Sequence, residues 1–94
     1  MSEKILTLNL DGKQGVNIDR VKYDVIKSAI LDAIDRQGEI LFKDLTPTVE
    51  SQLTDFEGSV SWYVVTIKLD LEVRGLIERI PKSSPQCIRR KSSA

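Results

Sequence analysis

The chain has 94 residues, with 14 Lys and Arg residues, 14 Asp and Glu residues and no His. This length accommodates one domain with a modest hydrophobic core, and the zero net charge excludes a global attraction to nucleic acid or to a membrane surface. A single cysteine, Cys87, excludes an internal disulfide framework. With no signal-peptide pattern and no apolar run near ~18 residues, the sequence predicts a cytoplasmic protein without a membrane segment.

The charges are unevenly distributed. Residues 1–80 carry 10 basic and 14 acidic side chains, a net charge of −4. Residues 81–94 carry no acid and four basic side chains, which are Lys82, Arg89, Arg90 and Lys91. The positive charge is therefore local to this last segment.

Residues 4–10 predict a half-buried strand, because their side chains alternate between two faces. One face carries Leu6, Leu8 and Leu10, and the other carries Ile5, Thr7 and Asn9. Asp11-Gly12 predicts a turn, and residues 16–18 suit a short extended piece. We expect residues 1–18 to pack as a strand and turn on a domain formed by residues 19–91, with 92–94 as a frayed tail.

A first helix is expected to begin after Asp19 as its N-cap and to run to about Arg36, before Gln37-Gly38. Its predicted core side carries Tyr23, Ile26, Ile30, Ala33 and Ile34. Residues 39–42 indicate a brief strand. A second helix should contain Val49, Leu53 and Phe56, and its start has two alternatives. Either Lys43 opens it with Pro47 inside, or Thr46 caps it with Pro47 as the first helical residue.

The central stretch, residues 58–79, predicts a long third helix with Ser59 as N-cap and Gly75 closing it. Two apolar rows lie on opposite sides of this helix at helical spacing. The first, a core stripe, is Val60, Val64, Ile67 and Leu71; the second is Trp62, Val65, Leu69 and Val73. Polar and charged residues, among them Lys68 and Asp70, separate the rows.

Residues 76–80 and 87–90 predict an antiparallel hairpin around the polar turn at 82–86. Three helices followed by a two-stranded hairpin is the order of a winged helix, in which the third helix can enter a DNA groove and the hairpin forms the wing. The fold class predicted from the sequence is therefore α+β, a winged helix-turn-helix with an extra N-terminal strand.

The segment LDLEVRGLIER, Leu69 to Arg79, resembles the helix-to-wing junction of MarR-like and PadR-like transcriptional regulators. A wider resemblance covers KILTLNLDGKQGVNIDRVKYDVIKSAIL and SWYVVTIKLDLEVRG, which are similar to a family of small, stand-alone bacterial winged-helix proteins of unknown function. The resemblance implies an N-terminal strand, an aromatic pair at Trp62-Tyr63 and the winged-helix fold. It implies no activity.

DNA binding, with a role in transcription regulation, is the leading functional hypothesis from the sequence. The expected nucleic-acid contacts are Ser59, Ser61, Tyr63 and Thr66 on the third helix and Lys82, Arg89, Arg90 and Lys91 on the wing and tail. A solvated, inert terminus is the alternative for these basic residues. The third helix offers no Arg, Asn or Gln in its first turns for paired base contacts, which predicts weak or loosely specific binding.

The competing hypothesis is a protein-interaction or dimerisation module without DNA binding. Its interface is the row Trp62, Val65, Leu69 and Val73, in which Trp is a residue that interfaces favour. We expect a homodimer, while the alternative is that the N-terminal strand or the wing covers this row as core. An enzyme is not expected, because no His is present and no Gly-rich loop precedes a helix. Nor does the sequence predict a cofactor, a metal or a small-molecule ligand.

Overall fold

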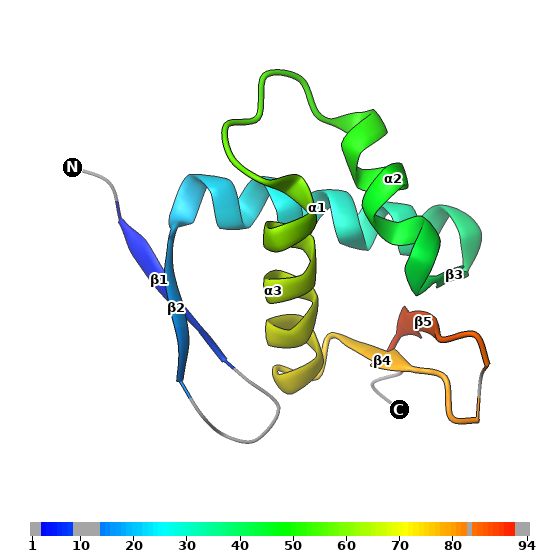
Figure 1. The fold of residues 1–94 in the computed structure, drawn as a ribbon. Coiled ribbons are helices and arrows are strands. Elements are labelled where there is room, and N and C mark those ends of the chain that lie inside the picture. The colour runs from blue at the N-terminus through cyan, green and yellow to red at the C-terminus, as the bar shows by residue number, and fades with distance from the viewer. Residues whose placement is uncertain (1–2, 9–13, 83, 92–94) are drawn as a thin grey trace.

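The computed structural model describes residues 3–8, 14–82 and 84–91. Within these ranges the chain is an α+β structure with three helices and two small antiparallel sheets (Figure 1). The elements in chain order are β1 (Lys4–Leu8), β2 (Gln14–Asp19), α1 (Arg20–Gln37), β3 (Glu39–Leu41), α2 (Phe42–Gln52), α3 (Val60–Val73), β4 (Ile77–Arg79) and β5 (Cys87–Arg90).

Strands β1 and β2 pair antiparallel and form the first sheet. The hydroxyl of Thr7 accepts from the Val16 N–H at 2.9 Å and donates to the Val16 carbonyl at 3.1 Å. A Cβ atom at Gly15 would lie 2.2 Å from this hydroxyl, so a residue without a side chain is needed there. The predicted turn at Asp11-Gly12 falls outside the described residues.

Helix α1 begins and ends as predicted. The Asp19 carboxylate accepts from the Val21 N–H at 2.9 Å and caps its first turn. Gly38 ends the helix with a φ of 80°, and its N–H donates to the Ile34 carbonyl at 2.7 Å. The buried residues of α1 include the whole predicted core side and are Tyr23, Ile26, Ala29, Ile30, Ala33 and Ile34.

Helix α2 begins at Phe42 and contains Pro47. Of the two predicted starts, the structure therefore selects the earlier one near Lys43. Leu45 and Val49, one helical turn apart, are fully buried and anchor α2 to the core.

The prediction that α2 extends through Leu53 and Phe56 is wrong, because the helix ends at Gln52. Leu53 already has an extended backbone, and Asp55 adopts a left-handed φ of 55°, which an Asp tolerates and a helix does not. Both apolar residues still pack against the core from the loop. The helical spacing of Leu53 and Phe56 therefore does not indicate a helix at these residues.

Helix α3 has both predicted caps. The Ser59 hydroxyl accepts from the Trp62 N–H at 3.3 Å. At the other end Gly75 has a φ of 79°, and the Leu76 N–H reaches back to the Leu71 carbonyl at 3.0 Å, which satisfies a helix end. The fully buried residues of the predicted core stripe are Val64, Ile67 and Leu71.

The second sheet has the strand order β3-β5-β4, with both pairs antiparallel. The predicted hairpin is therefore confirmed as β4 and β5, and β5 also pairs with β3. In Figure 1, α3 crosses in front of α1, with the β1–β2 hairpin on one side and the three-stranded sheet on the other. This arrangement leaves one face of α3 uncovered by any helix.

Candidate functional site on helix α3

A buried carboxylate, Asp70, joins three elements of the fold. It is completely buried on α3 and accepts hydrogen bonds from the Leu8 N–H of β1 at 2.8 Å and from the Arg74 Nε at 2.9 Å. The hydroxyl of Tyr23, on α1, also donates to it. Helical spacing places Asp70 on a polar flank of the helix, so the sequence did not predict this network.

The network shifts the pKa values of its members. Burial raises the pKa of the Tyr23 hydroxyl, and the hydrogen bond to Asp70 and the charge of that carboxylate raise it further. For Arg74, burial acts to lower the pKa, but the hydrogen bond and charge of Asp70 prevail and raise the pKa. Both partners therefore stay protonated and keep donating to Asp70.

We expect the protein to lose stability in alkali through Tyr23. Its pKa in the folded state is above the ordinary value of about 10, so the neutral hydroxyl contributes stability that is complete below about pH 10 and declines as pH rises above it. Urea unfolding between pH 8 and pH 11 measures this decline. Tyr23→Phe should be less stable at pH 8 but should lose less stability towards pH 11. An equal decline in both proteins would contradict the assignment.

A second internal ion pair holds Lys68, the cation within α3 itself. The Nζ atom of Lys68 lies 2.8 Å from an oxygen of Glu72, and both side chains are largely buried. The same ammonium lies 4.7 Å from the centre of the Phe42 ring. Lys68 is therefore paired with Glu72, and Arg74, the C-cap residue, is paired with Asp70, so neither cation is unpaired.

The row predicted as an interface, hereafter the α3 seam, consists of Trp62, Val65, Leu69 and Val73. Three of its side chains are exposed: 47% for Trp62, 41% for Val65 and 38% for Val73. Leu69 is half-buried. The predicted alternative, that this row is plain core, therefore does not describe the whole row.

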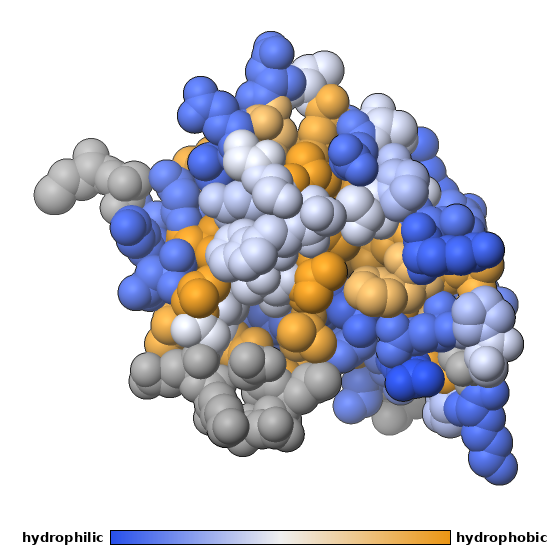
Figure 2. Space-filling view, in the orientation of Figure 1, coloured by the Kyte–Doolittle hydropathy of each residue, from blue (hydrophilic) through white to orange (hydrophobic). Residues whose placement is uncertain are grey.

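The β1–β2 hairpin covers the seam only in part. Between the hairpin and α3 lies a cleft of about 160 Å³, lined by Thr7, Leu8, Gly15, Val16, Trp62, Thr66 and Leu69. The hairpin itself exposes the apolar side chains Leu6, Leu8 and Val16, of which Leu8 and Val16 line the cleft. Figure 2 shows apolar and near-neutral side chains through the middle of this face, with hydrophilic side chains at its top and along both its left and right margins.

The α3 residues predicted to contact DNA are only partly accessible. Ser59 is occupied as the N-cap, and its hydroxyl lies 3.3 Å from that of Ser61. Tyr63 is half-buried, with its ring edge-on to Phe56 at a centroid distance of 5.2 Å. Thr66 lines the cleft beneath the hairpin. Ser61 is thus the most available of these four predicted contacts.

On the wing, the two predicted arginines have carboxylate partners. The Nε atom of Arg89 lies 2.7 Å from Glu78 on β4, and that of Arg90 lies 3.1 Å from Asp35 on α1. Lys82 and Lys91 are exposed, and neither forms an ion pair within the described residues.

Two further features are absent from the described part of the chain. No group of three or more His, Cys, Asp or Glu residues there is arranged to hold a metal ion. None of the helices found there is both long and apolar enough to cross a membrane.

The fold and surface together define a small α+β domain whose third helix carries an exposed apolar seam. The chain belongs to the family of unknown function DUF6958, which matches residues 4–88. No curated protein and no solved structure matches the chain. The predicted resemblance to a family of unknown function is thereby confirmed. The winged-helix character of that family and the likeness to MarR-like and PadR-like regulators stay predictions. The function of this family is unknown, so the family assigns no activity to the chain.

Proposed function

We propose that this protein is a winged-helix interaction module that pairs with a second copy of itself through the α3 seam. The proposal rests on the contrast between the exposed apolar side chains of α3 and the paired cations beside them. The apolar seam faces outward, while Lys68 and Arg74 are held by internal carboxylates. Such a helix favours contact with another apolar surface over contact with a polyanion.

The order of the elements supports the winged-helix assignment. Helices α1, α2 and α3 are followed by the β4–β5 hairpin, and the short strand β3 between α1 and α2 completes the sheet. A three-helix unit with a hairpin wing has this order. The β1–β2 hairpin is an addition that packs on the flank of α3 and holds it through Asp70.

The seam has the spacing of a helix-pairing surface. Trp62, Val65, Leu69 and Val73 stand at i, i+3, i+7 and i+11, which forms a stripe along one side of a helix. Burying an exposed side chain of this size completely is worth about 1.5–3 kcal/mol, so partial burial of the seam still provides a useful gain. Trp62, at one end, can pack against Val73 of an antiparallel partner helix.

The charges on and beside the α3 seam favour a second copy of the chain as its binding partner. Pairing around a two-fold axis brings the same surface of both chains together, so any unpaired charge on the seam would face its like. The seam has no charged member, and the neighbouring cations Lys68 and Arg74 are already neutralised. Antiparallel helices also place opposite ends of their dipoles side by side.

The mass of the protein in solution tests the pairing. We expect a species of twice the chain mass of 10.6 kDa in sedimentation experiments at micromolar concentration. Val65→Glu should give a folded monomer, because a carboxylate on each copy would be buried against its like. Val21→Glu, an equally drastic change at an exposed site on α1, should remain a dimer. A wild-type monomer, or a Val65→Glu dimer, would contradict the proposal.

DNA binding is the competing function, favoured by the winged-helix order and by the exposed Lys82 and Lys91. It predicts that the triple variant Arg89→Ala, Arg90→Ala, Lys91→Ala binds duplex DNA more weakly and with a smaller salt dependence. Four phosphate contacts correspond to a log–log salt slope of about −3.6. Titration of generic duplex DNA at low salt separates the two functions, since the pairing proposal expects no binding that depends on these residues.

A further inference from the structure

A second apolar surface lies along α1 and includes no residue of the α3 seam. Its apolar lining, hereafter the α1 groove, consists of Val21, Val25, Ala29, Leu53 and Phe56. One hollow, of about 280 Å³, lies between the start of α1 and the loop after α2. An adjoining open hollow, of about 710 Å³, continues between α1 and the end of α2. Val25 and Leu53 line both, so the two form one continuous groove.

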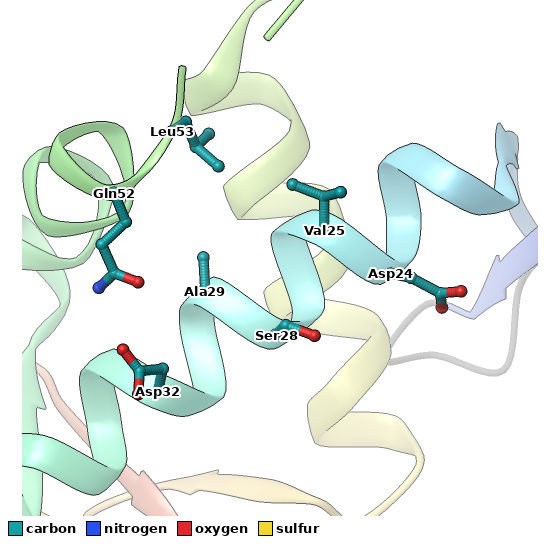
Figure 3. Close-up of a pocket in the computed structure, with 7 residues that line it drawn as sticks. All are labelled: Asp24, Val25, Ser28, Ala29, Asp32, Gln52 and Leu53. Carbon is teal, nitrogen blue, oxygen red and sulfur yellow. The ribbon is translucent and has the colours of Figure 1, made fainter. Parts of the chain in front are cut away.

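The groove is open and apolar along its floor. Val21 is 71% exposed and Val25 is 41% exposed, although both are large hydrophobic residues. Figure 3 shows Val25 and Ala29 of α1 and Leu53 of the loop after α2 pointing into the same gap, with Asp32 and Gln52 at one end. From Val21 to Asp32 the groove follows about 16 Å of helix, or three turns.

The rim of the groove is acidic. Its lining includes four carboxylates and one cation: Asp24, Asp32, Asp55, Glu57 and Lys22. The Lys22 ammonium, 5.8 Å from the Phe56 ring centre and 5.7 Å from that of Tyr63, keeps its charge, so the five charged groups of the lining have a net charge of 1 − 4 = −3. Asp24 and Asp32 have exposed arginine partners at 3.8 Å and 3.0 Å, whereas Asp55 and Glu57 form no ion pair within the described residues.

We infer that the α1 groove binds a short, basic amphipathic helix of another protein. An apolar floor three turns long fits a helix that presents apolar residues at i, i+4 and i+7. The acidic rim would attract lysines or arginines on the flanks of that helix and repel an acidic one. A second copy of the chain is a poor occupant, because two such grooves would bring carboxylates against carboxylates.

The basic segment of the chain itself is also held elsewhere. Arg89 and Arg90 belong to β5, in the middle of its sheet, and each has a carboxylate partner outside the groove. The occupant is therefore a separate molecule. This inference does not depend on pairing through the α3 seam, since no residue is shared between the two surfaces.

A labelled peptide tests the inference directly. The probe is a synthetic amphipathic helix of about five turns with leucines on one face and lysines on the other, and its match has glutamates in place of the lysines. Fluorescence anisotropy with the full chain should show binding of the Leu/Lys peptide below about 100 μM and at least tenfold weaker binding of the Leu/Glu peptide.

Two protein variants locate the binding site. Val21→Ser, combined with Val25→Ser, removes the two most exposed apolar side chains of the groove without adding charge and should weaken binding of the Leu/Lys peptide at least tenfold. Val65→Glu alters the α3 seam alone and should leave peptide binding unchanged whether or not the protein pairs, so the two proposals fail separately. Circular dichroism confirms that each variant is folded. Equal binding of both peptides, equal binding by the groove variant, or no binding at 100 μM would overturn the inference.

Discussion

Replacing Asp70 with Ala is expected to reduce the free energy of unfolding by about 3–5 kcal/mol, a large part of the stability of a domain of this size. The carboxylate is completely buried and accepts from Leu8, Tyr23 and Arg74. Its removal leaves a buried hydroxyl and a backbone N–H without their acceptor and a guanidinium without its counter-charge. The β1–β2 hairpin should also loosen from α3.

Urea unfolding followed by circular dichroism measures this loss. Asp35→Ala is the matched control, because Asp35 also pairs with an arginine, Arg90, but both side chains are about half exposed. Such a surface pair contributes less than about 1 kcal/mol. If both substitutions cost the same, the Asp70 network would not be the connection that holds the hairpin, α1 and α3 together.

Ile30→Ala is expected to cost about 2–5 kcal/mol, because it opens a cavity at a completely buried position in α1. Ile30 belongs to the main core, in which α1 packs against both α2 and α3. Alanine favours helix, so its higher helix propensity offsets only a few tenths of the loss.

Val21→Ala is the control for this change. Val21 is on the same helix but is largely exposed, so its replacement should change the free energy of unfolding by about 0.5 kcal/mol or less. Urea midpoints of the two variants should therefore differ clearly. Similar midpoints would mean that the side of α1 bearing Ile30 does not form the core.

The limits of α1 and α3 could be predicted because they depend on interactions between residues that are close in the sequence. Asp19 and Ser59 cap α1 and α3 through hydrogen bonds within three residues, and Gly38 and Gly75 supply the left-handed conformation at each end. The apolar repeat then identified the buried sides. Interactions that reach only a few residues along the chain are visible in the sequence.

The end of α2 and the Asp70 network could not be predicted in this way. Helical spacing continues through Leu53 and Phe56, and nothing local shows that the backbone has left the helix. Asp70 meets Tyr23 and Leu8 across 47 and 62 residues of sequence, so its burial depends on tertiary packing. The Arg74 side chain one turn away was the only local sign that this acid needed a partner.

Of the two candidate surfaces, the sequence predicted the α3 seam but not the α1 groove. The α3 seam followed from a second apolar row that the core stripe did not need. The α1 groove was not predicted because Val21 and Val25 lie outside the core repeat of α1. They form an apolar surface only together with Leu53 and Phe56, which the fold places beside them. An apolar pair at i, i+4 on the outer side of a helix was the available signal.

The central place of β5 has a consequence for the synthesis of the protein. This strand follows every other element in the sequence, yet β3 and β4 pair only with it and not with each other. On the ribosome, both strands must therefore wait for residues 87–90 before their sheet can form. A nascent chain stalled earlier would present two unpaired strand edges, which are open to pairing with neighbouring chains.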